Sequence, residues 1–140
     1  MAVTQIFVNL PVADVQASRA FYEAVGASVN PEFSDESSTS LALGETVFVQ
    51  IMNHTRFTSF TKRPVATDGV EVINALGVGS REEVDRIADA ALQAGGTESN
   101  DAQDLGWMYN RAFADLDGHH WEVAFLDEAA MAEAFAAEGA

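Results

Sequence analysis

The sequence predicts an α+β fold in which one β-α-β-β unit occurs twice. Residues 10–14 (LPVAD) close an alternating strand pattern and lead into an amphipathic helix, and residues 76–80 (LGVGS) do the same in the second half of the chain. Each helix pattern ends at glycine and is followed by further strand-like runs. A repeat of this kind indicates two matching units, which bury their apolar faces by pairing.

The first unit begins with a strand and a helix. Apolar side chains alternate with others along residues 5–12, as in a half-buried strand. Asp14 can cap the helix that follows, and Gly26 can end it. Further strand patterns predict a hairpin preceded by one short strand, at residues 29–33, 39–43 and 46–52.

Residues 53–69 carry no clear periodicity and predict a linker or a flap between the units. They contain Arg56, Lys62 and Arg63, three of the seven cationic side chains of the chain. Two interpretations stay open, because loops often carry function. The segment is either a solvated connection or a loop that places positive charge over an anionic ligand.

The second unit repeats the pattern from residue 70 onward. Ser80 and Glu83 have the spacing of a capping box, in which Glu83 reaches back to the Ser80 amide, and glycines at 95 and 96 end the helix. The following stretch is polar, so we expect a loop there, then two strands joined by a turn, and last an alanine-rich helical tail that docks weakly. These elements span residues 97–106, 107–113, 119–126 and 128–140.

Composition excludes several classes of partner. Asp and Glu number 22 against 7 Lys and Arg, giving a formal net charge of −15, which repels nucleic acids and anionic membrane surfaces. No apolar run has the length of a membrane span, and the N-terminus has no export signal. The chain has no cysteine, so it can form neither a disulfide nor a thiolate site. We therefore expect a cytoplasmic protein with no nucleic-acid or membrane partner.

Taken together, the motifs resemble those of the vicinal oxygen chelate superfamily, the group of glyoxalase I, bleomycin-resistance proteins, fosfomycin thiol transferases and extradiol dioxygenases. The resemblance covers roughly residues 4–127. Its markers are residues 10–14 before Phe21 and Tyr22, residues 75–78 (ALGV), and residues 115–118 (DLDG) before Glu122.

The resemblance implies two βαβββ repeats pairing into a curled mixed sheet with an open cup. It implies one domain over residues 1–140, with units at 4–57 and 70–127, a linker or flap at 58–69 and an acidic helical tail at 128–140. It also implies a homodimer.

In such proteins a divalent metal, when present, is held by one residue from each of four strands. The resemblance places these positions at Phe7, Gln50, Ile73 and Glu122. Phe7 and Ile73 are hydrocarbon side chains and cannot donate an electron pair, whereas catalytic metal sites usually have at least three protein ligands. A site rebuilt from Gln50, His120 and Glu122, with Zn, Ni, Mn or Fe, is the alternative to a pocket without a cofactor.

Strand alternation groups the other candidate residues by face. Phe7 and Asn9 share one face of their strand, as do Phe48, Gln50 and Met52 of theirs, and we expect both groups to line the ligand site. His120 and Glu122 also share a face and could act as a general acid/base pair. The other interpretation of His120 is a pocket histidine that forms structural hydrogen bonds.

In the strand at residues 107–113, Trp107, Tyr109 and Arg111 share a face. Alternation alone does not decide which face lines the cup. We favour this one, because a guanidinium buried under a packed helix is costly, and because Arg111 could then neutralise Glu122. Trp107 and Tyr109 would stack on the ligand or would be ordinary core aromatics.

Two functions follow. The first is binding of a small organic molecule in an aromatic-lined cup, without the full metal site. The alternative is a metal-dependent enzyme of lyase or dioxygenase type, in which Glu122 and His120 are the catalytic candidates. True glyoxalase I activity is not expected, because Phe7 and Ile73 stand at ligand positions.

Overall fold

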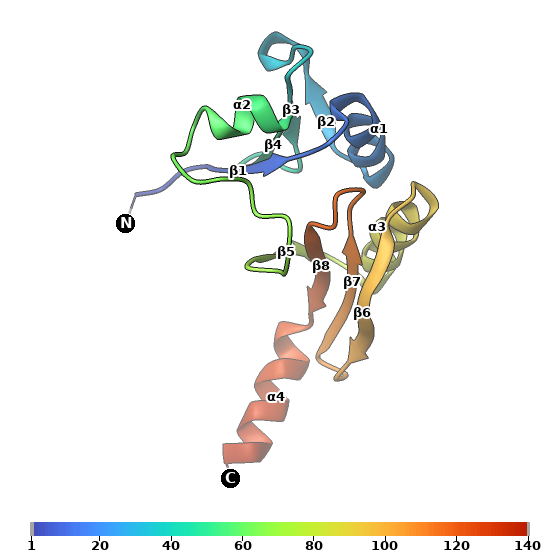
Figure 1. Cartoon of the computed structure of the whole chain (residues 1–140). Helices are drawn as coiled ribbons and strands as arrows, with labels where there is room; N and C mark the ends of the chain where they lie inside the picture. The colour runs from blue at the N-terminus through green and yellow to red at the C-terminus, as the bar shows by residue number, and fades with distance from the viewer. Residues whose placement is uncertain (1, 140) are drawn as a thin grey trace. The chain divides into compact units, whose positions relative to one another are not determined.

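The computed structural model describes residues 2–139, and the chain forms two compact units that divide between Val70 and Glu71 (Figure 1). Each unit is an open, four-stranded mixed sheet with helices, and the second unit repeats the strand order of the first. The predicted α+β fold with an internal repeat is therefore confirmed. That the two units form one domain stays a prediction.

The first unit has the sheet order β1-β4-β3-β2. The edge strand β1 runs parallel to β4, and the other neighbours are antiparallel. Its elements are β1 (Ile6–Pro11), α1 (Val15–Val25), β2 (Ser28–Asn30), the 3-10 turn η1 (Pro31–Phe33), β3 (Ser38–Ala42), β4 (Val47–Met52) and α2 (His54–Thr58).

The second unit has the order β5-β8-β7-β6, again with the first strand parallel to the last. Its elements are β5 (Ile73–Val78), α3 (Arg81–Gln93), β6 (Thr97–Asp104), β7 (Met108–Ala114), β8 (His120–Leu126) and α4 (Glu128–Gly139). Residue 140 of the predicted tail lies outside the described residues.

The predicted helix caps are present. The Asp14 carboxylate accepts a hydrogen bond from the Ala17 amide at 3.0 Å, and Gly26 ends α1 with φ at 121°, a conformation that favours glycine. The Ser80 hydroxyl accepts from the Glu83 amide at 3.1 Å. The Glu83 carboxylate, however, pairs with Arg86, so only half of the expected capping box is formed.

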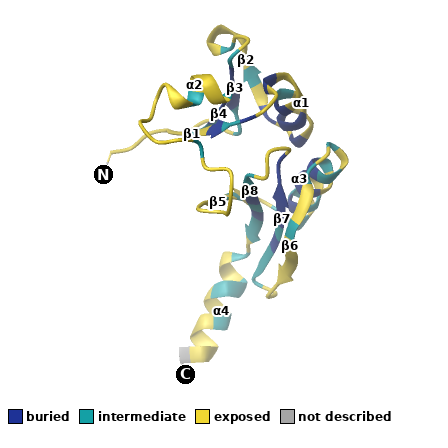
Figure 2. Ribbon diagram, in the orientation of Figure 1, coloured by how far each residue is buried: buried dark blue, intermediate teal, exposed yellow. Residues whose placement is uncertain are grey.

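Each sheet buries one face against its long helix (Figure 2). In the first unit, Phe21 and Tyr22 of α1 are almost fully buried in the core that α1 forms with β3 and β4. In the second, Val84 of α3 is buried in the core that α3 forms with β7 and β8, where Phe113 and Trp121 are the largest side chains. The faces turned away from α1 and α3 are the ones left for a site.

Three segments differ from the sequence prediction. The short strand expected at residues 29–33 ends at Asn30, and the residues after it form the 3-10 turn η1. Residues 97–104 are not a loop but the strand β6, which lies at the sheet edge and pairs with β7 through a ladder with register shifts. Nearly all of its residues are exposed, so no apolar alternation marks it. Residues 54–58 of the expected linker form the short helix α2, capped by Asn53.

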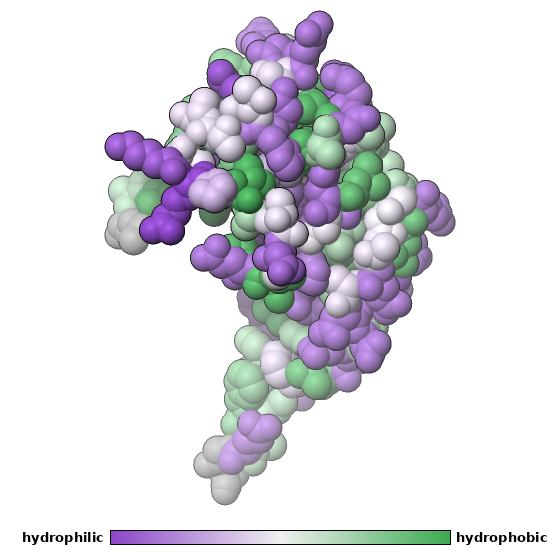
Figure 3. All heavy atoms as spheres, in the orientation of Figure 1, coloured by the Kyte–Doolittle hydropathy of each residue, from purple (hydrophilic) through white to green (hydrophobic). Residues whose placement is uncertain are grey.

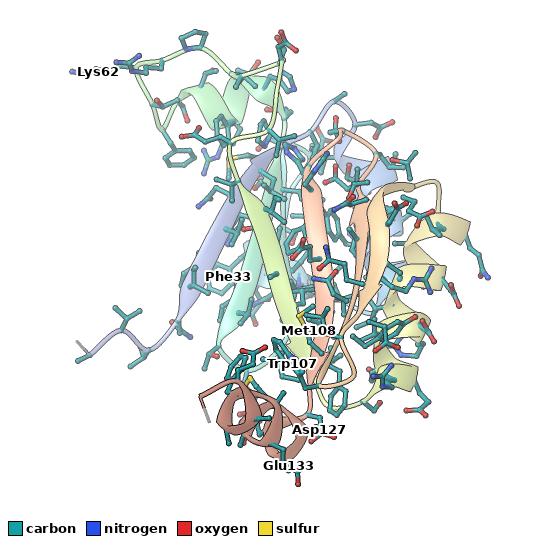
Figure 4. All side chains as sticks on the ribbon, turned by 90° about the horizontal axis from the view of Figure 1, so that it is seen from below. Phe33, Lys62, Trp107, Met108, Asp127 and Glu133 are labelled. Atoms are coloured by element: carbon teal, nitrogen blue, oxygen red, sulfur yellow. The ribbon has the colours of Figure 1, made fainter. Side chains whose placement is uncertain are left out.

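The predicted helical tail is confirmed as α4. Its Phe135 ring contacts the Trp107 ring at the start of β7, with centroids 5.2 Å apart, and Trp107 and Met108 lie beside this helix (Figure 4). No helix within residues 2–139 is both long enough and apolar enough to cross a bilayer. Hydrophilic side chains cover much of the face shown in Figure 3.

Candidate functional site

The first unit contains a cavity of about 670 Å³ on the sheet face that α1 does not cover. Side chains alternate along each strand, so Val49 and Ile51 of β4 are buried in the core while Gln50 and Met52 line the cavity. The lining residues come from β1, η1, β3, β4, α2 and the loops beside them: Phe7, Asn9, Glu32, Phe33, Ser34, Asp35, Ser38, Gln50, Met52, Arg56 and Phe60.

Three exposed aromatic rings stand around this cavity. Phe7 of β1 stacks on Phe48, its register partner on β4, with ring centroids 4.9 Å apart and an interplanar angle of 16°. Phe33 of η1 (Figure 4) and Phe60, which follows α2, are 68% and 67% exposed. Rings left this open at a cavity wall offer stacking surface to a ligand.

The α2 helix brings a positive charge to the cavity. Asn53 caps it by accepting a hydrogen bond from the Arg56 amide at 2.8 Å, and the Arg56 guanidinium lies 5.1 Å from the centroid of the Phe60 ring. Lys62 lies at the outer end of the following loop, and neither it nor Arg63 lines the cavity (Figure 4). Of the three cations noted in this segment, Arg56 is thus the one at the site.

Negative charge is present at the same cavity. Asp35 accepts hydrogen bonds from the hydroxyl and amide of Ser37 at 2.7 and 2.8 Å and from the Ser38 amide at 3.0 Å. These bonds, with a smaller contribution from the Arg56 charge, hold the pKa of Asp35 below its usual value. With Glu32 also in the wall, the cavity presents charges of both signs.

Gln50 lies in the cavity wall as predicted, but its amide is engaged within the sheet. The Nε2 atom donates to the Ser40 hydroxyl at 3.1 Å, across the β3–β4 ladder. Asn9, its register partner on β1, donates to the Phe7 carbonyl at 3.2 Å. Sequence reasoning placed Phe7, Asn9, Gln50 and Met52 on one face correctly. It missed Phe33 and Phe60, which lie outside regular strands.

In the second unit, Glu122 of β8 is held by a residue that sequence reasoning missed. Asn110 of β7 is buried and donates from Nδ2 to Glu122 Oε2 at 3.1 Å. His120 is two residues away on the same strand, beside Ile73 of β5 in the register. His120 and Glu122 alternate along β8, and this pattern marks a polar sheet face in the sequence. Asn110 is the polar residue that β7 places on the same face, so the pattern could have led to it.

Tyr109 and Arg111 do not share this face, which corrects the sequence interpretation. The Tyr109 hydroxyl donates to Asp85 of α3 at 2.6 Å, and Arg111 donates to Asp85 and Asp89 at 3.1 and 2.8 Å. The predicted cost of a guanidinium beside a helix is offset, because α3 presents two carboxylates at the rim of the sheet. The Trp107 ring contacts Phe135 of α4. Arg111 pairs with Asp85 and Asp89, and the hydrogen bond to Glu122 comes from Asn110 instead.

The four metal positions implied by the resemblance do not supply a full set of donors. Of the four positions, each unit supplies two. The first unit has the amide of Gln50 and the hydrocarbon ring of Phe7, and the second has the carboxylate of Glu122 and the hydrocarbon side chain of Ile73. Within residues 2–139 no three His, Asp or Glu side chains are grouped so that they could hold a metal ion. The donor chemistry therefore does not fit the four-ligand metal centre that the resemblance implies.

Comparisons with known proteins agree with this fold. Residues 4–44 match the family model described as bleomycin resistance protein-like N-terminal. No curated protein matches the chain. A hypothetical protein from S. aureus has 28% sequence identity and a TM-score of 0.75, with 89% of this chain and 95% of that chain covered.

Two more distant structures share the fold. One is a glyoxalase/bleomycin resistance protein/dioxygenase family enzyme from Burkholderia phytofirmans PsJN, with 18% identity, a TM-score of 0.70 and coverage of 86% of this chain and 96% of that one. The other is the fosfomycin resistance protein FosX from Mesorhizobium loti, with 16% identity, a TM-score of 0.67 and coverage of 89% and 93%. The repeated unit, the N-terminal match and these likenesses support the resemblance to the vicinal oxygen chelate superfamily, and the chain shares the glyoxalase/bleomycin-resistance fold.

Proposed function

We propose that this protein binds a small organic molecule in the cavity of its first unit, and that it does so without a metal cofactor. The observation that carries the proposal is the cavity of about 670 Å³ with Phe7, Phe33 and Phe60 in its walls. Small-molecule sites usually combine apolar and aromatic walls with a few polar groups that orient the ligand, and their volumes are about 300–1,000 Å³.

The chemistry of the wall favours binding over metal-assisted catalysis. At the first family ligand position the Phe7 ring stacks on Phe48, so this position offers a π-face rather than a lone pair. The Gln50 amide nitrogen donates to Ser40, which leaves the neutral amide oxygen as its donor atom, a weaker metal ligand than the carboxylate or imidazole of a usual site. Arg56, Glu32 and Ser38 remain as groups that can orient a polar ligand.

The test is a titration with the fluorescent aromatic sulfonate ANS, which emits strongly in apolar sites. The Phe33→Ala variant should raise the Kd by roughly 2- to 10-fold, because it removes one stacking ring. The matched control is Leu105→Ala, which removes an exposed apolar side chain of the second unit. Equal weakening by both variants, or the absence of saturable binding to the unmodified protein, would overturn the proposal.

A metal-dependent enzyme with Gln50, His120 and Glu122 as ligands is the second candidate. It is favoured by Glu122, which occupies the last family ligand position and keeps a hydrogen-bonding partner, Asn110. Metal content of the untagged protein would be measured after incubation with Ni, Zn, Mn or Fe(II). A stoichiometric metal that is lost in Glu122→Gln would support this candidate over the first.

We also propose that the protein works as a cytoplasmic homodimer, the assembly that the family resemblance implies. Light scattering after size exclusion should give about twice the chain mass of 15.0 kDa. A mass equal to one chain would contradict the dimer without affecting the binding proposal.

A further inference from the structure

A second cavity, of about 600 Å³, is present in the first unit and shares walls with the first. Its lining residues are Asn9, Met52, Phe57, Phe60 and Thr61. Asn9, Met52 and Phe60 line both volumes. The two cavities therefore meet along these three side chains and can be treated as two compartments of one site.

The α2 helix gives a charged side chain to one compartment and an apolar side chain to the other. Arg56 lines the first compartment, and the next residue, Phe57, lines the second. Successive residues of a helix point about 100° apart, so one short helix can serve both volumes. The first compartment contains Glu32, Asp35 and Arg56, whereas the second has no charged side chain in its wall.

Phe60 is fixed at the boundary between the compartments. Its amide donates to the Phe57 carbonyl at 3.0 Å, which ties the residue to the end of α2. The Cζ atom of the Arg56 guanidinium lies 5.1 Å from the centroid of its ring. A cation held over an aromatic face restrains both side chains, so the ring forms a wall between a charged and an apolar volume.

We infer that the ligand is an amphiphile with a polar head and an apolar arm, and that Phe60 is the specificity-determining residue between their two compartments. This inference rests on the proposed function. The head carries charges of both signs, because Arg56 faces an anionic group and Glu32 a cationic one. The arm is hydrocarbon or aromatic, because Met52, Phe57 and Phe60 receive it.

The probes are alkyl sulfobetaines, zwitterions with tails of four to ten carbons, titrated by calorimetry below their micellar concentrations. Once the tail passes Phe60, affinity should rise by up to about fourfold per added CH₂, the increment for burial of one methylene. Phe57→Ala should flatten this dependence on tail length and leave the shortest probe unaffected, while Phe57→Leu should largely restore it.

Phe33→Ala is the matched control, because Phe33 lines only the charged compartment. It should weaken all tail lengths by the same factor. We expect the unmodified protein to prefer a linear over a branched eight-carbon tail, because the tail must pass the Phe60 ring. Phe60→Ala should remove this preference, because it removes that ring from the boundary between the compartments. Circular dichroism of each variant confirms that it is folded.

The outcomes separate this inference from the proposed function. If ANS binds in the Phe33-dependent manner but sulfobetaine affinity is independent of tail length, or if Phe57→Ala weakens all lengths equally, the two-compartment inference is wrong and the binding function stands. If neither ANS nor any sulfobetaine binds, the proposed function itself fails.

Discussion

Replacing Thr39 by valine should stabilise this protein. The Thr39 side chain, on β3, is 1% exposed, and its hydroxyl has no hydrogen-bond partner within residues 2–139. It faces the core beneath α1, where Leu41, Val49 and Ile51 are fully buried. A buried hydroxyl without a partner keeps the cost of its lost hydration.

The expected magnitude follows from this environment. Leaving a buried polar group unsatisfied costs about 1–3 kcal/mol, and valine has nearly the same shape and the same β-branching as threonine. We expect Thr39→Val to raise the free energy of unfolding by about 1 kcal/mol, which for a chain of this size raises Tm by roughly 3–5 °C. Urea denaturation with an unchanged m-value measures the same quantity.

Ser40→Ala is the matched control, one residue along the same strand and on the opposite face. The Ser40 hydroxyl accepts from Gln50 Nε2 at 3.1 Å, so its removal leaves a partly buried donor unpaired and should lower stability by about 1 kcal/mol. If the two substitutions change the free energy of unfolding in opposite directions, the effect depends on whether the hydroxyl has a hydrogen-bond partner and not on the apolar character of the new side chain. A Thr39→Val variant that is less stable than the parent would refute the reasoning.

Three further predictions concern the second unit. Hydrogen bonds from the Arg81 side chain and the Gly106 amide lower the pKa of Asp104 to about 2. The stability that this carboxylate contributes is therefore present above its unfolded pKa and is lost as the pH falls toward about 2. The urea midpoints of the parent and Asp104→Asn should therefore differ at pH 6 and converge near pH 2; a constant difference would contradict the assignment. Arg111→Met should lower stability by about 1 kcal/mol, and by less in 1 M NaCl, because the two aspartates of α3 that pair with it are half exposed. Phe135→Ala should red-shift Trp107 emission and reduce helical ellipticity, since the contact between these two rings docks α4 on β7; unchanged spectra would show that α4 is held by other contacts.

The sequence predicted those elements whose two faces meet different surroundings. Strand β4 alternates because Val49 and Ile51 enter the core while Gln50 faces the cavity, and the helices show a buried stripe for the same reason. Strand β6 escaped prediction because both of its faces are exposed, so its sequence carries no contrast. Periodicity reports differences in burial, and an edge strand without a buried face gives no signal.

The site was predictable to the extent that it lies on strands. Alternation placed Asn9 and Gln50 correctly, whereas Phe33 and Phe60 belong to a 3-10 turn and a loop that no period describes. The wrong choice of face for Tyr109 and Arg111 has a different origin. That choice was based on the cost of burying the Arg111 guanidinium beneath a helix. The sequence does not show that Asp85 and Asp89 of α3 lie beside Arg111, where their carboxylates offset this cost.

The internal repeat shows how one scaffold can hold two chemistries. Phe7 of β1 pairs with Phe48 on β4, and the corresponding pair in the second unit is Ile73 with His120. Two residues further along each ladder, on the same face, Asn9 pairs with Gln50 and Ala75 pairs with Glu122. The strand pairing is the same in both units. It therefore determines the positions of these side chains on the sheet but not their chemical type.

Both units keep the same strand pairing although Phe7 and Ile73 stand at positions where the resemblance implies metal ligands. Phe7 stands at the first of the ligand positions that the resemblance implies, where its ring stacks on Phe48 and forms part of the cavity wall. A phenyl ring at this position can stack on a ligand but cannot coordinate a metal. The aromatic wall of the first unit therefore supports the proposed binding of a small molecule by stacking.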